Sequence, residues 1–74
     1  MSHNNYKNLD TLYHGEFVAH INQHLRTRDV SVSVVRVYTD RSGAEKETRH
    51  VPLRLLAEYQ EVIKLVSARV AELS

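Results

Sequence analysis

The alternating run VSVSVVRVY, residues 30–38, constrains the fold of this chain more than any other feature. Successive side chains alternate between two faces, and most residues are valine or tyrosine, which is typical of a β-strand. The segment TDRSG follows it and supplies an Asp and a Gly, which are typical of a chain reversal at residues 40–43. The sequence therefore predicts a β-hairpin, in which the chain after residue 43 returns beside the first strand.

The position of the turn sets the register of this hairpin. With a turn at residues 40–43, Thr39 faces Ala44 and Arg36 faces Glu47, so opposite charges meet near the tip. The apolar pairs expected at the base are Val32 with Val51 and Val30 with Leu53.

The segment LRLLAEYQEVIKLVSARVAEL, residues 53–73, is predicted as an amphipathic α-helix. Pro52 suits either the end of the second strand or the first turn of this helix, where a missing N–H is no loss. Apolar residues recur at spacings of three and four along it, and charged residues cover the opposite face. The residues expected to form the core and a dimer surface are Leu55, Tyr59, Val62, Ile63, Val66 and Val70.

Residues 8–25 are predicted as a second helix. The apolar residues that recur at helical spacing are Leu9, Leu12, Tyr13, Phe17, Ile21 and Leu25. Asn8 is a suitable N-cap. Gly15 costs about 1 kcal/mol relative to alanine inside a helix, and the alternative is a break into two shorter helices. Residues 1–7 show no periodic pattern and are expected to be a flexible N-terminus.

The predicted order of helix, strand, strand, helix gives a small two-layer αββα unit of the α+β class, with one domain at residues 8–74. A chain of 74 residues buries only roughly 60% of its unfolded surface. The last helix carries more apolar surface than one hairpin and one helix can cover, and the hairpin has two open edges. We therefore expect a homodimer, joined through helices or through strands, and the alternative is a larger protein partner.

The chain contains no cysteine, which excludes disulfides, a thiolate nucleophile and cysteine-containing zinc sites. The N-terminus lacks the features of a signal peptide, and no apolar run approaches the length of a membrane span. These features predict a soluble, cytoplasmic protein without a membrane partner.

His20 and His24 lie four residues apart, which would place them on one side of a helix. Zinc needs at least a third protein ligand, and the HExxH pattern is absent because Ile21, Asn22 and Gln23 separate the two histidines. We regard them as weak metal candidates, and a pH-sensitive interface is an alternative. No metal and no cofactor is expected.

Catalysis is not expected either. The two glycines do not form a P-loop, two are too few for a dinucleotide-binding fingerprint, and no GxSxG motif occurs. Glu58 and Glu61 share a helix face, but that face is the charged exterior of the last helix. The sequence therefore favours a protein that acts by binding.

The charge distribution suggests where a ligand would bind. Residues 26–54 carry a net charge of +3, against +1 for the whole chain. The ligand-contact residues predicted on and near the hairpin are Arg36, Tyr38, Arg41, Lys46 and Arg49. Four interleaved acids and a sequence pI of about 8.2 argue against a strongly basic nucleic-acid footprint. We therefore expect a protein-protein interaction module, an adaptor, inhibitor or accessory regulator, and the alternative is a dimeric nucleic-acid-binding regulator that contacts phosphates through these arginines.

Overall fold

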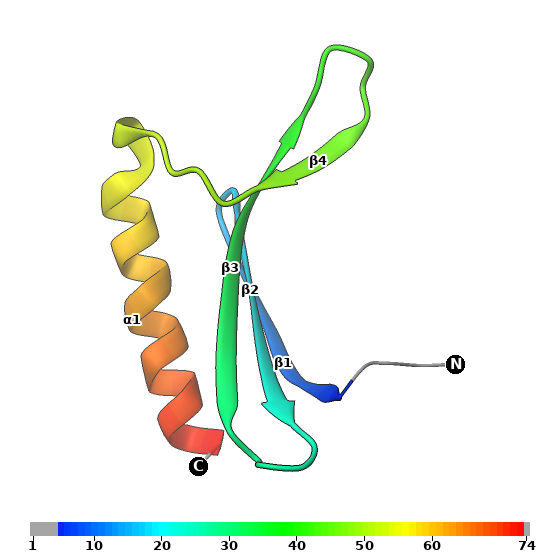
Figure 1. The fold of residues 1–74 in the computed structure, drawn as a ribbon. Coiled ribbons are helices and arrows are strands. Elements are labelled where there is room, and N and C mark those ends of the chain that lie inside the picture. The colour runs from blue at the N-terminus through cyan, green and yellow to red at the C-terminus, as the bar shows by residue number, and fades with distance from the viewer. Residues whose placement is uncertain (1–4, 74) are drawn as a thin grey trace.

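The structure, a computed structural model, describes residues 5–73 of the chain. It is a four-stranded antiparallel sheet in the order β1-β2-β3-β4, with one α-helix packed against one face (Figure 1). The elements are β1 (Tyr6–His14), β2 (Phe17–His24), β3 (Val30–Thr39), β4 (Glu45–Thr48), the 3-10 helix η1 (Leu53–Leu55) and α1 (Leu56–Leu73). The α+β class and the C-terminal helix predicted from the sequence are confirmed.

The prediction of a helix at residues 8–25 is wrong, because these residues form β1 and β2. The two strands are joined by a two-residue connection, Gly15 and Glu16, and His14 pairs with Phe17 across it. Gly15 has a φ of +58°, which matches the first central position of a type II′ hairpin turn. Gly15 thus reverses the chain, where the sequence had suggested at most a helix break.

A β-bulge explains why this hairpin has the apolar spacing of a helix. Residues of β2 alternate regularly, with Phe17, Ala19 and Ile21 all buried under α1. In β1 the register shifts between Asn8 and Asp10, so the strand contains one extra residue there. Leu9 and Leu12 therefore both pack against the core despite their odd spacing. The bulge thus accounts for the i, i+3 spacing of Leu9 and Leu12. Tyr13 and Leu25, which the helix prediction placed on the same apolar face, are exposed.

The N-terminal segment was predicted to be flexible through residue 7. Tyr6 and Lys7 belong instead to β1, where they pair with His24 and Gln23. Residues 1–4 lie outside the residues that the structure describes.

The hairpin of β3 and β4 is confirmed, but its register differs by one residue from the prediction. Thr39 pairs with Glu45, and Arg36 pairs with Thr48 rather than with Glu47. The turn is closed between Asp40 and Ala44, whose backbone groups bond at 2.9 Å. Pairing ends at Thr48, so the predicted pairs Val32–Val51 and Val30–Leu53 do not form.

The core lies between the sheet and α1. Its buried residues are Phe17, Ala19 and Ile21 from β2 with Leu55, Val62 and Val66 from η1 and α1. The ring of Phe17 meets that of Tyr59 edge to face, with centroids 5.6 Å apart. The sequence analysis predicted Phe17 and Ile21 on the buried face of a helix. Both residues are buried, but they belong to a strand.

The two flanks of α1 differ in character. One flank faces β1, because Arg69 bonds Asp10 there and Glu58 lies against Gly15 of the β1–β2 turn. Helical geometry places Leu65 on this same flank. The opposite flank, which faces β3, is uncharged and consists of Leu56, Tyr59, Ile63 and Val70. In the described part of the chain, α1 falls short of the length and apolarity that a membrane-spanning helix requires.

Candidate functional site

The β3–β4 hairpin extends past the end of the sheet that α1 covers, so both of its faces lie outside the core (Figure 1). Two features stabilise this extension locally. Asp40 accepts hydrogen bonds from the Ser42 hydroxyl at 2.6 Å and from the backbone N–H groups of Ser42 and Ala44 at 2.9 and 3.0 Å. Gly43 has a φ of +86°, the left-handed conformation typical of a three-residue hairpin loop with a bulge.

The Asp40 carboxylate is engaged by its own turn. The bond from the Ser42 hydroxyl is the largest effect on its pKa, and backbone N–H groups of the turn add to it against an opposing effect of desolvation. The pKa of Asp40 is consequently held below its usual value. Its carboxylate thus stabilises the turn, at one end of the hairpin.

The other charges of the hairpin are separated by face. Tyr38 pairs with Lys46, and Arg36 pairs with Thr48, so these side chains project from one face of the two strands. The pairs of the other face are Thr39 with Glu45 and Val37 with Glu47. Because side chains alternate along β4, Glu45 and Glu47 lie on one face of the hairpin and Lys46 lies on the other. Two of the four interleaved acids that argued against a basic footprint therefore belong to a different surface.

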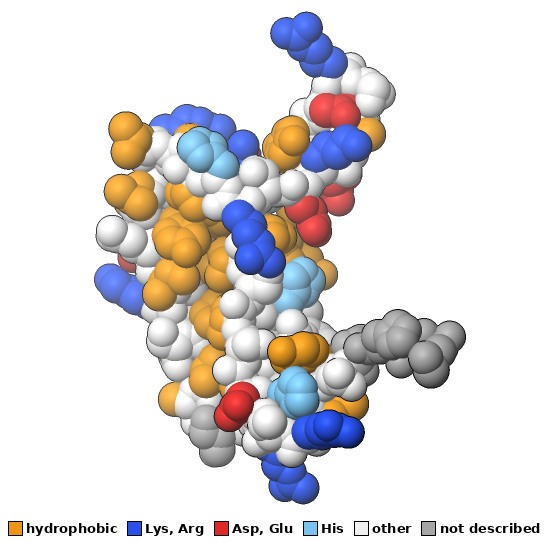
Figure 2. Space-filling model, in the orientation of Figure 1, with side chains coloured by type: hydrophobic (Ala, Val, Ile, Leu, Met, Phe, Trp, Pro, Cys, Tyr) orange, Lys and Arg blue, Asp and Glu red, His pale blue; other side chains and the backbone are white. Residues whose placement is uncertain are grey.

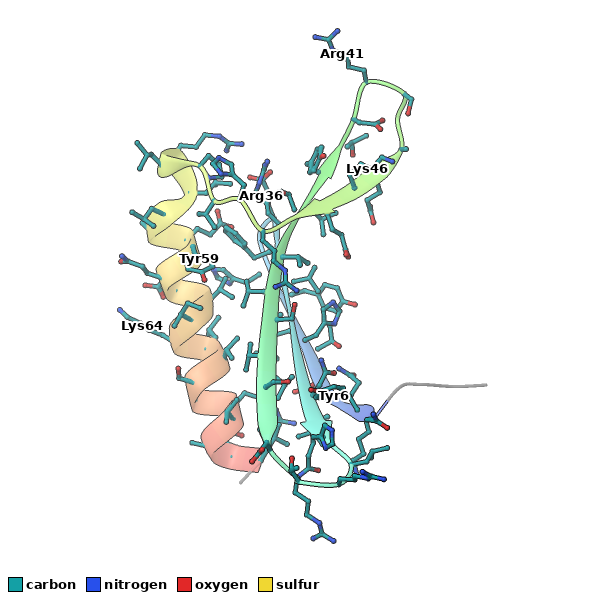
Figure 3. The ribbon with its side chains drawn as sticks, in the orientation of Figure 1. Tyr6, Arg36, Arg41, Lys46, Tyr59 and Lys64 are labelled. Carbon is teal, nitrogen blue, oxygen red and sulfur yellow. The ribbon has the colours of Figure 1, made fainter. Side chains whose placement is uncertain are left out.

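We call the first surface the cationic face, defined by Arg36, Tyr38, Lys46 and Thr48. The Arg36 guanidinium lies 5.4 Å from the centroid of the Tyr38 ring, which is within the range of a cation–π contact. Tyr38 is 37% exposed, so part of its ring remains open to a ligand. Figure 3 shows Lys46 on the projecting hairpin and Arg36 where the hairpin leaves the rest of the sheet.

Arg36 occupies the boundary between the cationic face and the core. Its side chain is 16% exposed, and its Nη1 lies 3.5 Å from the Glu16 carboxylate. Glu16 also lies 3.5 Å from Arg54, so one carboxylate serves two arginines. The Arg36 Nε is buried and has no hydrogen-bond partner. Arg36 therefore holds the base of the cationic face against Glu16, and only a small part of its side chain is open to a ligand.

The five ligand-contact residues predicted from the sequence are only partly brought together. Arg36, Tyr38 and Lys46 share the cationic face, and Arg41 lies at the exposed tip (Figure 3). Arg49 lies beyond β4 on the other face, where its Nη2 is 3.4 Å from the Ser33 hydroxyl. Sequence reasoning missed Glu16 as a partner of two arginines, because it placed Glu16 inside a helix.

The two candidate metal-binding histidines lie four residues apart on a strand, which separates them by about 13 Å. His20 contacts the Thr11 hydroxyl at 3.4 Å. His24 accepts backbone hydrogen bonds from Arg26 and Thr27 through Nδ1, and its ring meets Tyr6 edge to face. The helical geometry that suggested a ligand pair is absent. Among residues 5–73, no three His, Asp or Glu side chains gather in a way that would hold a metal ion.

A hollow of about 350 Å³ lies at the other end of the sheet. The residues that line it are Lys7, Gln23, His24, Leu25 and Arg28. It is partly open to solvent, and the ring of His24 is already engaged by the loop that follows β2. Its two basic residues, Lys7 and Arg28, add positive charge far from the hairpin. The cationic face differs in that its arginine is held by a ring contact and an ion pair.

Comparisons with protein-family models, with curated proteins and with solved structures found no match to this chain.

Proposed function

We propose that this protein binds nucleic acid through the cationic face of the β3–β4 hairpin. The observation that carries this proposal is the separation of charge across the hairpin, with Arg36 and Lys46 on one face and both glutamates on the other. Such a surface presents Lys46 and Arg36 to phosphates on the face opposite to Glu45 and Glu47, and Glu16 is the carboxylate that contacts Arg36 there. Arg41 extends the positive charge to the tip.

Tyr38 favours a single strand as the ligand. The Arg36 guanidinium lies over its ring, and Lys46 is its cross-strand partner. Bases of a single strand stack on such aromatic rings while nearby cations contact the backbone. A duplex would not present a free base face to one tyrosine. The affinity is expected to be modest for one hairpin and strongly dependent on salt.

The test is fluorescence anisotropy with a labelled single-stranded oligonucleotide and its duplex, titrated at several salt concentrations. Lys46→Ser is the principal variant, and Lys64→Ser is its matched control. Lys64 lies on the far side of α1 with its side chain 77% exposed (Figure 3). Its replacement removes the same charge as Lys46→Ser but leaves the cationic face intact. We expect Lys46→Ser to weaken binding and to reduce the slope of log K against log salt by about 0.7 on a single strand, while Lys64→Ser leaves both unchanged.

Tyr38→Ala and Tyr38→Phe separate stacking from charge. Loss of the ring is expected to cost about 1–3 kcal/mol in binding of a single strand, and Phe is expected to retain most of the affinity. Equal binding by the Lys46 and Lys64 variants, or no binding at low salt, would contradict the proposal. Preference for the duplex would retain the phosphate contacts but reject the stacking role of Tyr38.

Protein binding is a second candidate, and a specific observation favours it. Valines of β3 and the uncharged flank of α1 leave apolar side chains exposed, including Val32 at 41% and Ile63 at 38%. This surface is separate from the cationic face, so the two activities do not compete for the same residues. A larger protein partner bound here would make the chain an adaptor or inhibitor.

A further inference from the structure

The edge of β3 is open along half of its length. β4 pairs only with residues 36–39 of β3, and within the described chain no strand lies beside residues 30–35 on that side (Figure 1). The Val37 N–H bonds the carbonyl of Glu16, in the turn directly before β2, at 2.8 Å. Because backbone direction alternates along an antiparallel strand, Val30, Val32 and Val34 direct their N–H and C=O groups toward the open edge.

This edge lacks the features that usually protect an edge strand. Residues 30–35 contain no charge, no proline and no bulge. The opposite edge of the sheet, β1, carries Lys7 and Asp10 and is interrupted by a bulge. The difference indicates that the edge of β3, and not that of β1, is the one available for pairing with another strand.

The apolar surface continues from the edge onto the helix. Val30, Val32 and Val34 share the helix-facing side of β3, since they pair with Gln23, Ile21 and Ala19. The flank of α1 on this side is the uncharged one. Figure 2 shows hydrophobic side chains continuous between α1 and β3 on this face of the molecule. A partner that pairs with the edge would also cover this seam.

We propose that the occupant of this edge is a second copy of the chain, paired antiparallel to β3 about a two-fold axis at Val32. In this register Val32 faces its own copy and Val30 faces Val34, so every open backbone group of the three valines finds a partner. A two-fold axis normal to the sheet places both helices on one face. Val32 and Ile63 of both copies then line a single apolar seam.

Charge complementarity supports the second copy as the occupant. Asp29 lies at the start of β3, where its carbonyl accepts a hydrogen bond from His24. In the proposed register Asp29 faces Val35 of the other copy, one diagonal step from Ser33. Arg49 extends over Ser33, with its Nη2 3.4 Å from the hydroxyl. Asp29 of each copy therefore lies within reach of Arg49 of the other, and two-fold symmetry forms this ion pair twice.

The first test is the molar mass of the full chain by light scattering and sedimentation. We expect a reversible dimer of twice 8.6 kDa. Ile63→Lys and Val32→Lys are expected to raise its dissociation constant at least about 100-fold, because an unpaired charge would be buried in the seam. The matched control is Leu65→Lys, on the β1-facing flank at 47% exposure, which is expected to leave the dimer unchanged.

Two further measurements test the pairing itself. Asp29→Arg and Arg49→Asp are each expected to weaken the dimer, and the double variant to restore it. This charge exchange keeps the proposal testable if a lysine in the seam prevents folding. Amide hydrogen exchange is expected to show Val32 and Val34 protected at dimer concentrations and unprotected on dilution.

Four results would overturn the proposal. A monomer at all accessible concentrations would exclude a second copy as the occupant. Capture of a larger protein by the edge of a monomeric chain would do the same. A dimer disrupted by Leu65→Lys and not by Ile63→Lys would place the interface on the other flank of α1. A dimer in which the Val32 and Val34 amides exchange freely would exclude strand pairing.

Discussion

Arg69 near the C-terminal end of α1 donates from Nε to the Asp10 carboxylate on β1, with 2.6 Å between the two atoms. The pair connects the helix to the edge strand that lies farthest from the β3–β4 hairpin. Arg69 also lies 3.3 Å from Glu72 of its own helix. These contacts give the β1-facing flank of α1 its charged character.

This ion pair predicts a pH dependence of stability. The hydrogen bond from Arg69 is the largest of the effects that keep the pKa of Asp10 below its usual value of 3.8. A carboxyl with a lowered pKa in the folded state contributes stability above its unfolded pKa, and this contribution is lost as pH falls through the folded value. Thermal melts between pH 7 and pH 2 should therefore show a loss of stability in acid.

Asp10→Asn tests the origin of this loss. The variant is expected to be less stable at pH 7 and to show a flatter pH profile below pH 4 or so, since the titrating group is gone. The remaining acid dependence should come in part from Asp40, whose pKa is also lowered. An Asp10→Asn profile parallel to that of the unmodified chain would show that the ion pair contributes little in solution.

The two glycines provide a second prediction, because both have a positive φ but different surroundings. A Cβ added at Gly15 would overlap the Glu58 carboxylate, while one added at Gly43 would meet nothing within 4 Å. Alanine in the left-handed region costs roughly 1–2 kcal/mol. Gly43→Ala is expected to show this cost alone in urea unfolding. Gly15→Ala is expected to cost more, and equal costs would mean that Glu58 moves aside freely.

Burial along β2 gives a third prediction that distinguishes strand from helix. Ala19 is fully buried and Ile21 is fully buried, while His20 between them lies on the other face of the sheet. Ala19→Leu is expected to destabilise the chain by about 1–3 kcal/mol, since the added side chain has no space under α1. His20→Leu introduces the same side chain at the next residue, on the other face of the sheet, and is expected to change stability far less. The reverse order of effects would contradict the assigned faces of β2.

The same residues show what the sequence was able to predict. The run at residues 30–38 is rich in valine and alternates over its first half, and the segment after Pro52 has a long helical period, so both were identified correctly. In β1 the bulge changes the alternation, and Leu9 and Leu12 acquire a helical spacing within a strand. Periodicity cannot separate these cases, because a bulge depends on pairing with β2.

The candidate site was predicted in composition but not in arrangement. The alternation along β4 already implied that Glu45 and Glu47 lie opposite Lys46, and this signal was available in the sequence. The register error moved Arg36 onto Glu47, so a cation and an acid appeared to be partners. The position of Asp40, which closes the loop onto Ala44, decides the register and is a property of the folded turn.

The proposed dimer leads to a last prediction about nucleic-acid binding. Antiparallel pairing of β3 directs the two hairpins to opposite ends of the joined sheet, and Tyr38 lies six residues from the axis at Val32. The two tyrosines would then lie about 40 Å apart. A long strand could contact both hairpins and gain affinity through effective concentration, whereas a strand of a few nucleotides would contact one.

Ile63→Lys and Leu65→Lys test this link, since both add one positive charge to α1 and differ in the flank that carries it. For a long oligonucleotide, we expect Ile63→Lys to bind more weakly than Leu65→Lys by a factor of about 10 or more. For a short oligonucleotide, the two variants should bind equally, because each hairpin acts alone. If the variants bind oligonucleotides of both lengths equally while Ile63→Lys is monomeric, the hairpins act independently, and the dimer serves stability rather than binding.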